Sequence, residues 1–252
     1  YIARTVEELY KAAGIASACG NVLSYRRRDR EEMVKGPAMQ KFLEKHPEAP
    51  VFPKKNWMQR IQMGITSVYR ECLYVFLQKF VYRGQMAFFG GITHPVGCAV
   101  AYRRKYIKEL FDHYEPILGD DLTNSEDIFI GFALLNHGYR NIQVPDILCR
   151  SQEPELRRLP HQFYMWSSAF LQSCYYFNAL TATPFKAFRR WKHEWDFKHS
   201  AKGKEIQNLR KVQEPYREAF GDEFTAKYGR PMGWSIFMSL VEKIAFPTVL
   251  LI

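Results

Sequence analysis

The sequence predicts an α/β protein in which a mixed sheet is flanked by helices. Strand-like runs at 15–24, 98–102 and 141–144 alternate with helical segments, and this alternation is typical of α/β folds. The chain has 252 residues, of which 47% are hydrophobic and 25% charged. That is enough apolar material to bury a core, and it excludes bulk disorder.

Capping residues and helix breakers set the expected helix boundaries in the first 100 residues. Thr5 is expected to cap a short helix that ends near residue 13, and Asn56 a long helix that ends near residue 82. Gly84–Gly97 is rich in glycine and is expected to be a loop. The basic run Arg26–Arg30 is expected to be a solvated loop, with phosphate or nucleic-acid binding as the less favoured alternative.

The same rules give the elements after residue 100. Ser125 is the expected N-cap of a helix over 126–136, because Gly138 follows its end. The strand over 141–144 is expected to end at Pro145, since proline lacks an amide hydrogen. The other expected elements are a helix over 103–112, a turn over 119–124, a helix over 155–180 that is broken near Pro160, and a helix that opens at Thr183.

The charge balance favours anionic partners. The chain has 36 Lys and Arg against 26 Asp and Glu, a formal net charge of +10. Nucleic acid, a phosphate-bearing substrate or an anionic membrane would each suit it, but no nucleic-acid-binding signature accompanies the basic residues, so nucleic acid is the least favoured. The five cysteines are widely spaced, which argues against a zinc site or a disulfide framework and favours a reducing compartment.

An acidic pair is the strongest candidate for chemistry. Glu126 and Asp127 fall in the first turn of a predicted helix, where the helix dipole and free amide groups stabilise negative charge. Such a carboxylate stays ionised at neutral pH and can accept a proton. The alternative interpretation is that the pair consists of ordinary helix-starting acids. Asp120 and Asp121, just upstream, are interpreted as part of a turn.

The order of motifs around this pair resembles family 2 glycosyltransferases, which are inverting enzymes with a GT-A fold, and in particular the cellulose and hyaluronan synthases. The resemblance covers residues 1 to about 180. It depends on motifs in the family's order: Phe88-Phe89-Gly90-Gly91, a strand ending in Arg103-Arg104, the Glu126-Asp127 pair, Gly138-Tyr139, Pro145-Asp146, and Gln162 followed four residues later by Trp166.

The resemblance implies a role for each motif residue. Asp127, with Glu126 beside it, would be the catalytic acidic pair, and Asp127 the general base that takes the proton of an acceptor hydroxyl. Trp166 would form a flat wall under the acceptor sugar. Gln162 would hydrogen-bond near the donor diphosphate or the acceptor. The three glycines of the 90–97 loop would let the backbone approach the acceptor; they are Gly90, Gly91 and Gly97.

Two departures from the family pattern affect donor binding. The arginine of the family's Q-x-x-R-W motif, which helps to stabilise the leaving diphosphate, is Met165 here. Arg157 or Arg158 could substitute for it. The family's D-x-D motif, which holds a divalent metal (Mg or Mn) against the donor, is expected upstream of Tyr1. This chain alone is therefore expected to be inactive.

Residues 181–252 are expected to form basic amphipathic helices that lead to a membrane segment. Residues 184–204 carry seven Lys and Arg against two acids, with Phe185, Phe188, Trp191 and Trp195 near one helical face. This pattern suits a membrane interface, although a helix packed on the core would also show it. The apolar run at 244–252 is either the start of a spanning helix or a buried helix.

The expected function is therefore inverting transfer of a sugar from a nucleotide-sugar to a glycan or lipid-linked acceptor. It would take place at a membrane, with the catalytic part on the cytoplasmic side. The alternative is a non-catalytic glycosyltransferase-like subunit that binds glycan or acts as a scaffold, which the methionine at position 165 would also suit.

Overall fold

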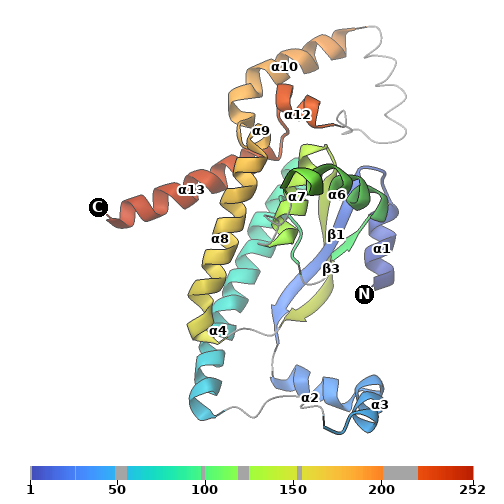
Figure 1. Ribbon diagram of the computed structural model, residues 1–252, viewed down its shortest axis with the longest axis vertical. Helices are drawn as coiled ribbons and strands as arrows, with labels where there is room; N and C mark the ends of the chain where they lie inside the picture. The colour runs from blue at the N-terminus through green and yellow to red at the C-terminus, as the bar shows by residue number, and fades with distance from the viewer. Residues whose placement is uncertain are drawn as a thin grey trace.

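The computed structural model describes residues 2–25, 27–48, 56–97, 100–118, 125–151, 155–200 and 221–251. It is a mixed α/β protein with a small central sheet, as predicted (Figure 1). Its helices and strands are α1 (Ile2–Tyr10), β1 (Ile15–Ser24), α2 (Arg27–Lys35), α3 (Pro37–Lys45), α4 (Trp57–Phe76), the π-helical segment Leu77–Tyr82, α5 (Arg83–Phe89), β2 (Val100–Tyr102), α6 (Arg104–Leu118), α7 (Glu126–Asn136), β3 (Arg140–Ser151), the 3₁₀ turn Leu156–Arg158, α8 (Leu159–Tyr176), α9 (Asn178–Thr181), α10 (Thr183–His199), α12 (Asp222–Tyr228) and α13 (Gly233–Leu251).

The sheet has three described strands in the order β2-β1-β3. Strand β1 has the predicted bounds and lies in the centre, antiparallel to β2 and parallel to β3. Its first six residues are buried, because both faces of the strand are covered. Ala18 packs with Leu9 of α1 in one cluster, whereas Ala16 packs in the cluster that contains Phe132 of α7 and Phe170 of α8.

The prediction that the third strand ends at Pro145 is wrong. Strand β3 continues to Ser151, and its register against β1 shifts between Cys19 and Asn21. This irregularity accommodates the proline, whose carbonyl oxygen accepts a hydrogen bond from Asn21 Nδ2 at 2.7 Å. A strand can therefore pass through a proline where the ladder is already interrupted.

The long helix begins as predicted and extends further than predicted. Asn56 and Gln59 form a reciprocal capping box at the start of α4. The helix continues through the π-helical segment into α5, which ends at Gly90 with φ of 68°. The expected loop at 84–89 is thus wrong, because Gly84 is tolerated inside a helix whose tertiary contacts hold it. In the π segment, the Gln78 amide exchanges two hydrogen bonds with the backbone of Val22 in β1.

Two N-terminal predictions need correction. Thr5 is not a cap; it lies within α1 and is buried. The basic run is not a loop, because α2 begins at Arg27 and is followed by α3. The 27–35 segment has neither glycine nor proline and consists largely of residues with good helix propensity, which explains the difference.

The helices after residue 100 follow the prediction with local differences. The helix expected over 103–112 extends to Leu118, and the 126–136 helix has the predicted bounds. The expected 155–180 helix is divided into a 3₁₀ turn, α8 and α9, with Pro160 in the first turn of α8. The turn at 119–124 lies outside the described residues.

The main hydrophobic core crosses the expected domain boundary at residue 180. Phe132 of α7, Phe170 of α8, Leu180 of α9 and Ile236 of α13 belong to one buried cluster. In Figure 1, α13 projects sideways from the upper part of α8. No helix within the described ranges combines the length and apolar character needed to cross a membrane.

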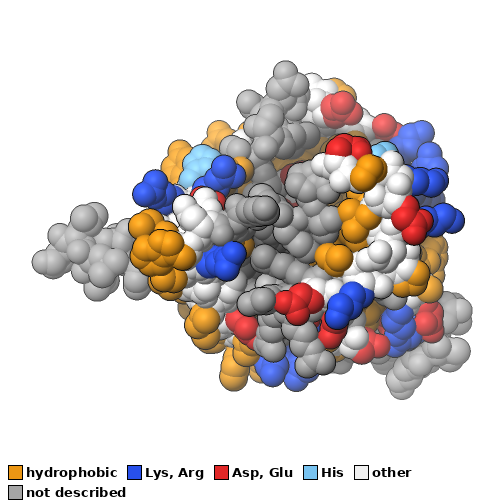
Figure 2. All heavy atoms as spheres, turned by 90° about the horizontal axis from the view of Figure 1, so that it is seen from below, with side chains coloured by type: hydrophobic (Ala, Val, Ile, Leu, Met, Phe, Trp, Pro, Cys, Tyr) orange, Lys and Arg blue, Asp and Glu red, His pale blue; other side chains and the backbone are white. Residues whose placement is uncertain are grey.

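One face of α4 carries exposed apolar side chains. Met58, Ile61, Ile65 and Val68 are each more than half exposed. Seen from below in Figure 2, hydrophobic side chains lie on the surface beside Lys and Arg side chains. The opposite face of α4 carries the buried residues Met63, Thr66 and Arg70.

Candidate active site

The Asp127 carboxylate lies at the first turn of α7, which is the predicted position. Its Oδ1 accepts a hydrogen bond from the Ile128 amide at 2.9 Å. Ser125 lies just before the first residue of α7. Its φ of 50° is in the left-handed region, and its hydroxyl does not cap the helix. Ser125 is thus the N-cap residue of α7, as predicted, but its side chain makes no capping hydrogen bond. Its carbonyl oxygen nevertheless accepts the Ile128 amide hydrogen and so starts the helix.

Gly97 is brought directly against Asp127. A Cβ atom built on Gly97 would lie 2.8 Å from Asp127 Oδ2 and 3.3 Å from its Cγ. The Gly97 backbone amide donates a hydrogen bond to the same carboxylate. Two residues that are 30 positions apart and were both predicted to belong to the site therefore meet. Only a residue without a side chain fits at this distance, which is a physical reason for glycine here.

Burial raises the pKa of the Asp127 carboxyl above its ordinary value, and the negative charge of Glu126 adds to that increase. Hydrogen bonds from the backbone amides of Ile128 and Gly97 act in the opposite direction. Asp127 is half-buried, whereas Glu126 is exposed. The arrangement yields a carboxylate that is more basic than a surface aspartate, which is the property that a general base needs.

Two tyrosines lie within electrostatic range of this carboxylate. Burial raises the pKa of Tyr82, and the charges of Cys19 and Asp127 contribute. Burial is also the main cause of the raised pKa of Tyr102, and the negative charge of Asp127 raises it further. Both phenols therefore stay protonated at neutral pH and can donate hydrogen bonds. Sequence analysis did not identify these tyrosines, because neither belongs to a recognised motif.

Gln162 and Trp166 lie one turn apart on α8, and a buried arginine of α4 joins them. A guanidinium nitrogen of Arg70 donates a hydrogen bond to Gln162 Oε1. The same guanidinium stacks on Trp166, with 4.4 Å between its Cζ and the indole centroid. Phe163 contacts the indole edge-on, with ring centroids 5.9 Å apart. That Gln162 contacts substrate stays a prediction; in the structure its side chain accepts a hydrogen bond from Arg70.

The two groups of residues lie along one long helix. Trp166 is beside Arg70 of α4, and Asp127 acts on Tyr82, which is 12 residues further along. At about 1.5 Å of rise per residue, positions 70 and 82 are roughly 18 Å apart along the helix axis. The carboxylate and the indole are therefore placed beside two different levels of this continuous helix.

Gly90 and Gly91 are not brought to Asp127. Gly90 ends α5 in the left-handed conformation, and a Cβ on Gly91 would lie 3.0 Å from the carbonyl oxygen of Asn141 in β3. Both glycines therefore serve the contact between α5 and the sheet in this structure. His94 follows them in the chain; burial lowers its pKa to about 4, so it is neutral at physiological pH.

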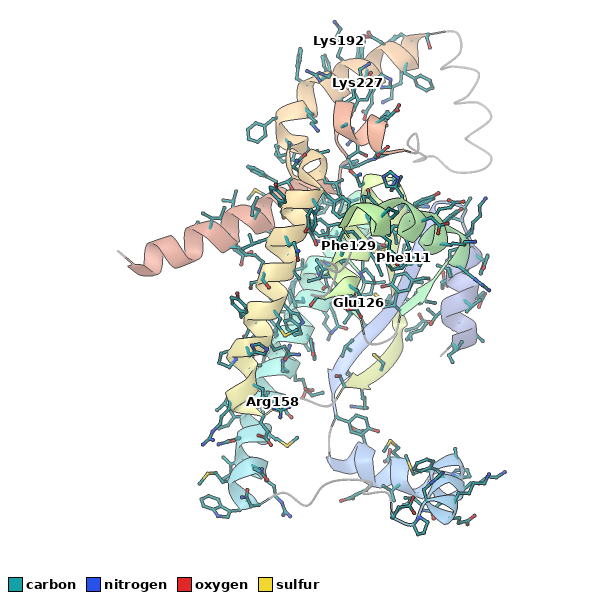
Figure 3. The ribbon with its side chains drawn as sticks, in the orientation of Figure 1. Phe111, Glu126, Phe129, Arg158, Lys192 and Lys227 are labelled. Atoms are coloured by element: carbon teal, nitrogen blue, oxygen red, sulfur yellow. The ribbon has the colours of Figure 1, made fainter. Side chains whose placement is uncertain are left out.

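Arg157 and Arg158, the expected substitutes for the missing motif arginine, are exposed in the 3₁₀ turn before α8. In Figure 3, Arg158 lies at the lower end of α8, whereas Glu126 and Phe129 lie on α7 near the middle of the molecule. The cation beside Gln162 and Trp166 is Arg70 instead, which the sequence did not predict. The available signal was an arginine in line with Met63 and Thr66 on the buried face of an amphipathic helix.

The residues present do not by themselves fit a divalent metal. Within the described ranges, no group of three or more His, Cys, Asp or Glu side chains is placed to hold a metal ion. Glu126 and Asp127 supply two carboxylates of which one is exposed. Asp120 and Asp121 lie outside the described residues.

No known protein family, curated protein or solved structure gave a match to this chain.

Replacing Gly97 with alanine is expected to displace the Asp127 carboxylate. The new methyl group would overlap Oδ2, and a misplacement of this size costs about 10²-fold in the rate of a catalysed reaction. The measurement is the transfer rate of the full-length protein, together with its thermal stability. Gly64→Ala is the matched control, because a Cβ there meets no atom within 4 Å. Equal transfer rates for both variants would contradict the placement of Asp127 in the site.

Proposed function

We propose that this chain is the acceptor-side part of an inverting glycosyltransferase that moves a sugar from a nucleotide-sugar to a glycan or lipid-linked acceptor at a membrane. The observation that carries the proposal is the half-buried Asp127 carboxylate, with its raised pKa, held against the backbone of Gly97. The order of sequence motifs around it supports the same conclusion.

In the proposed reaction, an acceptor hydroxyl lies against Asp127 and gives it its proton. The acceptor oxygen forms a bond to the anomeric carbon as the bond from that carbon to the diphosphate oxygen breaks. The nucleoside diphosphate leaves with the bonding electrons, and the configuration at the anomeric carbon inverts. Positioned proton transfer typically contributes about 10²–10⁴-fold to such a rate. Burial of the carboxylate favours the transfer, because it raises the basicity of the group.

Trp166 would support the acceptor, since the C–H face of a sugar ring packs on an aromatic ring. The indole is half-buried and held by Arg70 and Phe163, so its orientation is defined before a ligand arrives. Gln162 would contribute by fixing this arrangement. A divalent metal, Mg or Mn, would be bound by a D-x-D motif outside this chain and would neutralise charge on the donor diphosphate.

The test of the proposal uses the full-length protein in membranes. It would be incubated with UDP-glucose, UDP-N-acetylglucosamine and GDP-mannose, with Mg²⁺ or Mn²⁺ present. Transfer of sugar from one donor to a glycan or lipid, with inversion at the anomeric carbon, supports it. Absence of both transfer and nucleoside diphosphate release with every donor would reject it.

Helix α10 supports the proposed contact with a membrane. The catalytic part of the protein is proposed to lie on the cytoplasmic side of that membrane. Phe185, Phe188, Trp191 and Trp195 are each more than half exposed, and they fall within one arc of the helix. Lys192, labelled in Figure 3, lies on the same helix at the upper end of the molecule. Exposed aromatic rings beside cations suit the headgroup region of an anionic bilayer.

The double variant Trp191→Ala/Trp195→Ala is expected to bind vesicles containing phosphatidylglycerol at least about tenfold more weakly than the wild type. The loss reflects apolar area that no longer enters the interface, and added salt should weaken the remaining binding. Vesicle co-sedimentation measures it. Trp57→Ala is the matched control, because Trp57 is 70% exposed but lies at the far end of α4. Equal binding of all three proteins would refute this role for α10.

A second function is favoured by one specific observation. Gln162 is engaged by Arg70 within the protein. A non-catalytic subunit that binds glycan would have this property. It predicts oligosaccharide binding without nucleoside diphosphate release, which the same incubation distinguishes.

A further inference from the structure

Arg70 is the most unusual buried residue in the described part of the chain. Arg70 is 1% exposed, and it is the largest by volume of the fully buried residues that the structure describes. Arginine is almost never fully buried unless it is paired, because removing its charge from water costs free energy. A chain that needed only packing at this position would be served by methionine or leucine. The partners of the guanidinium therefore indicate what the charge is for.

Three of those partners come from the first turns of α8, and one comes from α4 itself. Arg70 donates to the Gln162 amide oxygen and stacks on the Trp166 indole, so it reaches residues at positions i and i+4 of that helix. The ring of Phe163 lies 5.8 Å from the same guanidinium, and that of Tyr74 lies 5.5 Å from it. A planar cation with several fixed donors can make a hydrogen bond and a stacking contact at once, which a lysine cannot reproduce.

We infer that Arg70 is a positioning residue: its buried guanidinium holds the Gln162 amide and one face of the Trp166 indole, and so sets the orientation of the acceptor platform. The inference rests on the proposed function for the role of Trp166, but the contacts themselves do not. Stacking on one face leaves the other as the face that can receive a sugar ring. The cation comes from α4, 92 residues before Gln162 in the sequence.

The rigidity of Trp166 is the property that Arg70 provides. A cation–π contact strengthens when it is shielded from water, and the Phe163 ring packs perpendicular to the indole. Together they limit the indole to one orientation, which lowers the entropy cost of stacking a ligand on it. Loss of Arg70 should leave the helices in place while the indole becomes free to rotate.

The first experiment needs no ligand. In Arg70→Met, an apolar side chain of similar volume replaces the cation, so the core stays filled while the hydrogen bond to Gln162 and the stacking on Trp166 are lost. The near-ultraviolet circular dichroism contributed by Trp166, measured as wild type minus Trp166→Phe, is expected to fall by at least half. The far-ultraviolet spectrum should be unchanged. Arg60→Met, an exposed position on α4, is the control and should retain the Trp166 signal.

The second experiment separates positioning from stability. Cellotetraose and chitotetraose serve as acceptor probes for the full-length protein, with the donor that the wild type uses. Arg70→Met should raise the acceptor KM about tenfold or more while nucleoside diphosphate release without acceptor is unchanged. Arg70→Lys should not restore the KM. In the double variant with Trp166→Ala, loss of Arg70 should add nothing further, because both changes act through the same ring.

The outcomes distinguish the inference from the proposed function. A full Trp166 signal in a folded Arg70→Met overturns the inference even if transfer is detected. If Arg70→Met does not fold, Arg70→Lys decides, since it keeps the charge and loses the stacking: a wild-type Trp166 signal in this variant overturns the inference. If no donor is used by the wild type, the proposed function fails, and the dichroism result still decides whether Arg70 positions Trp166.

Discussion

The Asp127→Asn variant of the full-length protein is expected to lose about 10²–10⁴-fold in transfer rate while it keeps its fold. Asparagine has nearly the same shape and can still accept the Ile128 amide hydrogen through its carbonyl oxygen. It cannot take a proton from an acceptor hydroxyl. The measurement is the initial rate of sugar transfer with the donor that the wild type uses, at saturating donor and acceptor.

The stability of the same variant provides an independent check. Because burial raises the pKa of the Asp127 carboxyl, its protonated form is the one that folding favours. The stability that the protonated group contributes is present at low pH and is lost as the pH rises through the folded-state pKa. Removing the ionisable group should therefore leave the free energy of unfolding at neutral pH unchanged or higher.

The matched control is Asp112→Asn, which makes the same chemical change on the exposed surface of α6. It should leave both the transfer rate and the stability near those of the wild type. A folded Asp127→Asn protein with a near-normal transfer rate would reject Asp127 as the base. Destabilisation without a catalytic effect would assign the carboxylate a structural role at the start of α7.

Trp166→Ala is the second change for which a large effect is expected. It removes the aromatic surface proposed to support the acceptor, and aromatic contacts of this kind contribute most of the energy at small interfaces. The acceptor KM should rise by about tenfold or more, whereas hydrolysis of the donor in the absence of acceptor should change little. Comparing oligosaccharide transfer with nucleoside diphosphate release measures both quantities.

The control for this variant is Tyr175→Ala, an exposed aromatic residue on the same helix that is 76% exposed. It should leave the acceptor KM unchanged. Truncation of a half-buried tryptophan also costs stability, so the comparison is made below the unfolding temperature of each protein. An unchanged acceptor KM in the folded Trp166→Ala variant would remove the platform role.

The sequence predicted correctly those helices and strands whose bounds depend on residues close together in the chain. Strand β1 and helix α7 have their predicted bounds, because a short uncharged run with six apolar residues forms the first and Gly138 follows the end of the second. Asn56 was a correct cap because its partner Gln59 is three residues away. The acidic pair and Gly97 were predicted from motif order, and the structure brings Asp127 and Gly97 together.

Features that depend on tertiary contacts could not be predicted in this way. Strand β3 passes through Pro145 because Asn21 and a register shift on the neighbouring strand accommodate it. Gly84 lies in a helix because the Gln78 amide fixes the preceding turn to β1. Arg70 meets Gln162 across 92 positions of sequence, and no local pattern specifies that contact.

A structure of the full-length protein with a bound acceptor oligosaccharide would decide most directly whether Asp127 acts on the acceptor. We expect an acceptor hydroxyl at about 2.6–3.2 Å from an Asp127 carboxylate oxygen, with a sugar ring further along the oligosaccharide stacked on the Trp166 face opposite Arg70. An acceptor bound elsewhere, or a carboxylate that remains closed off by Gly97 with the sugar in place, would contradict the proposed function.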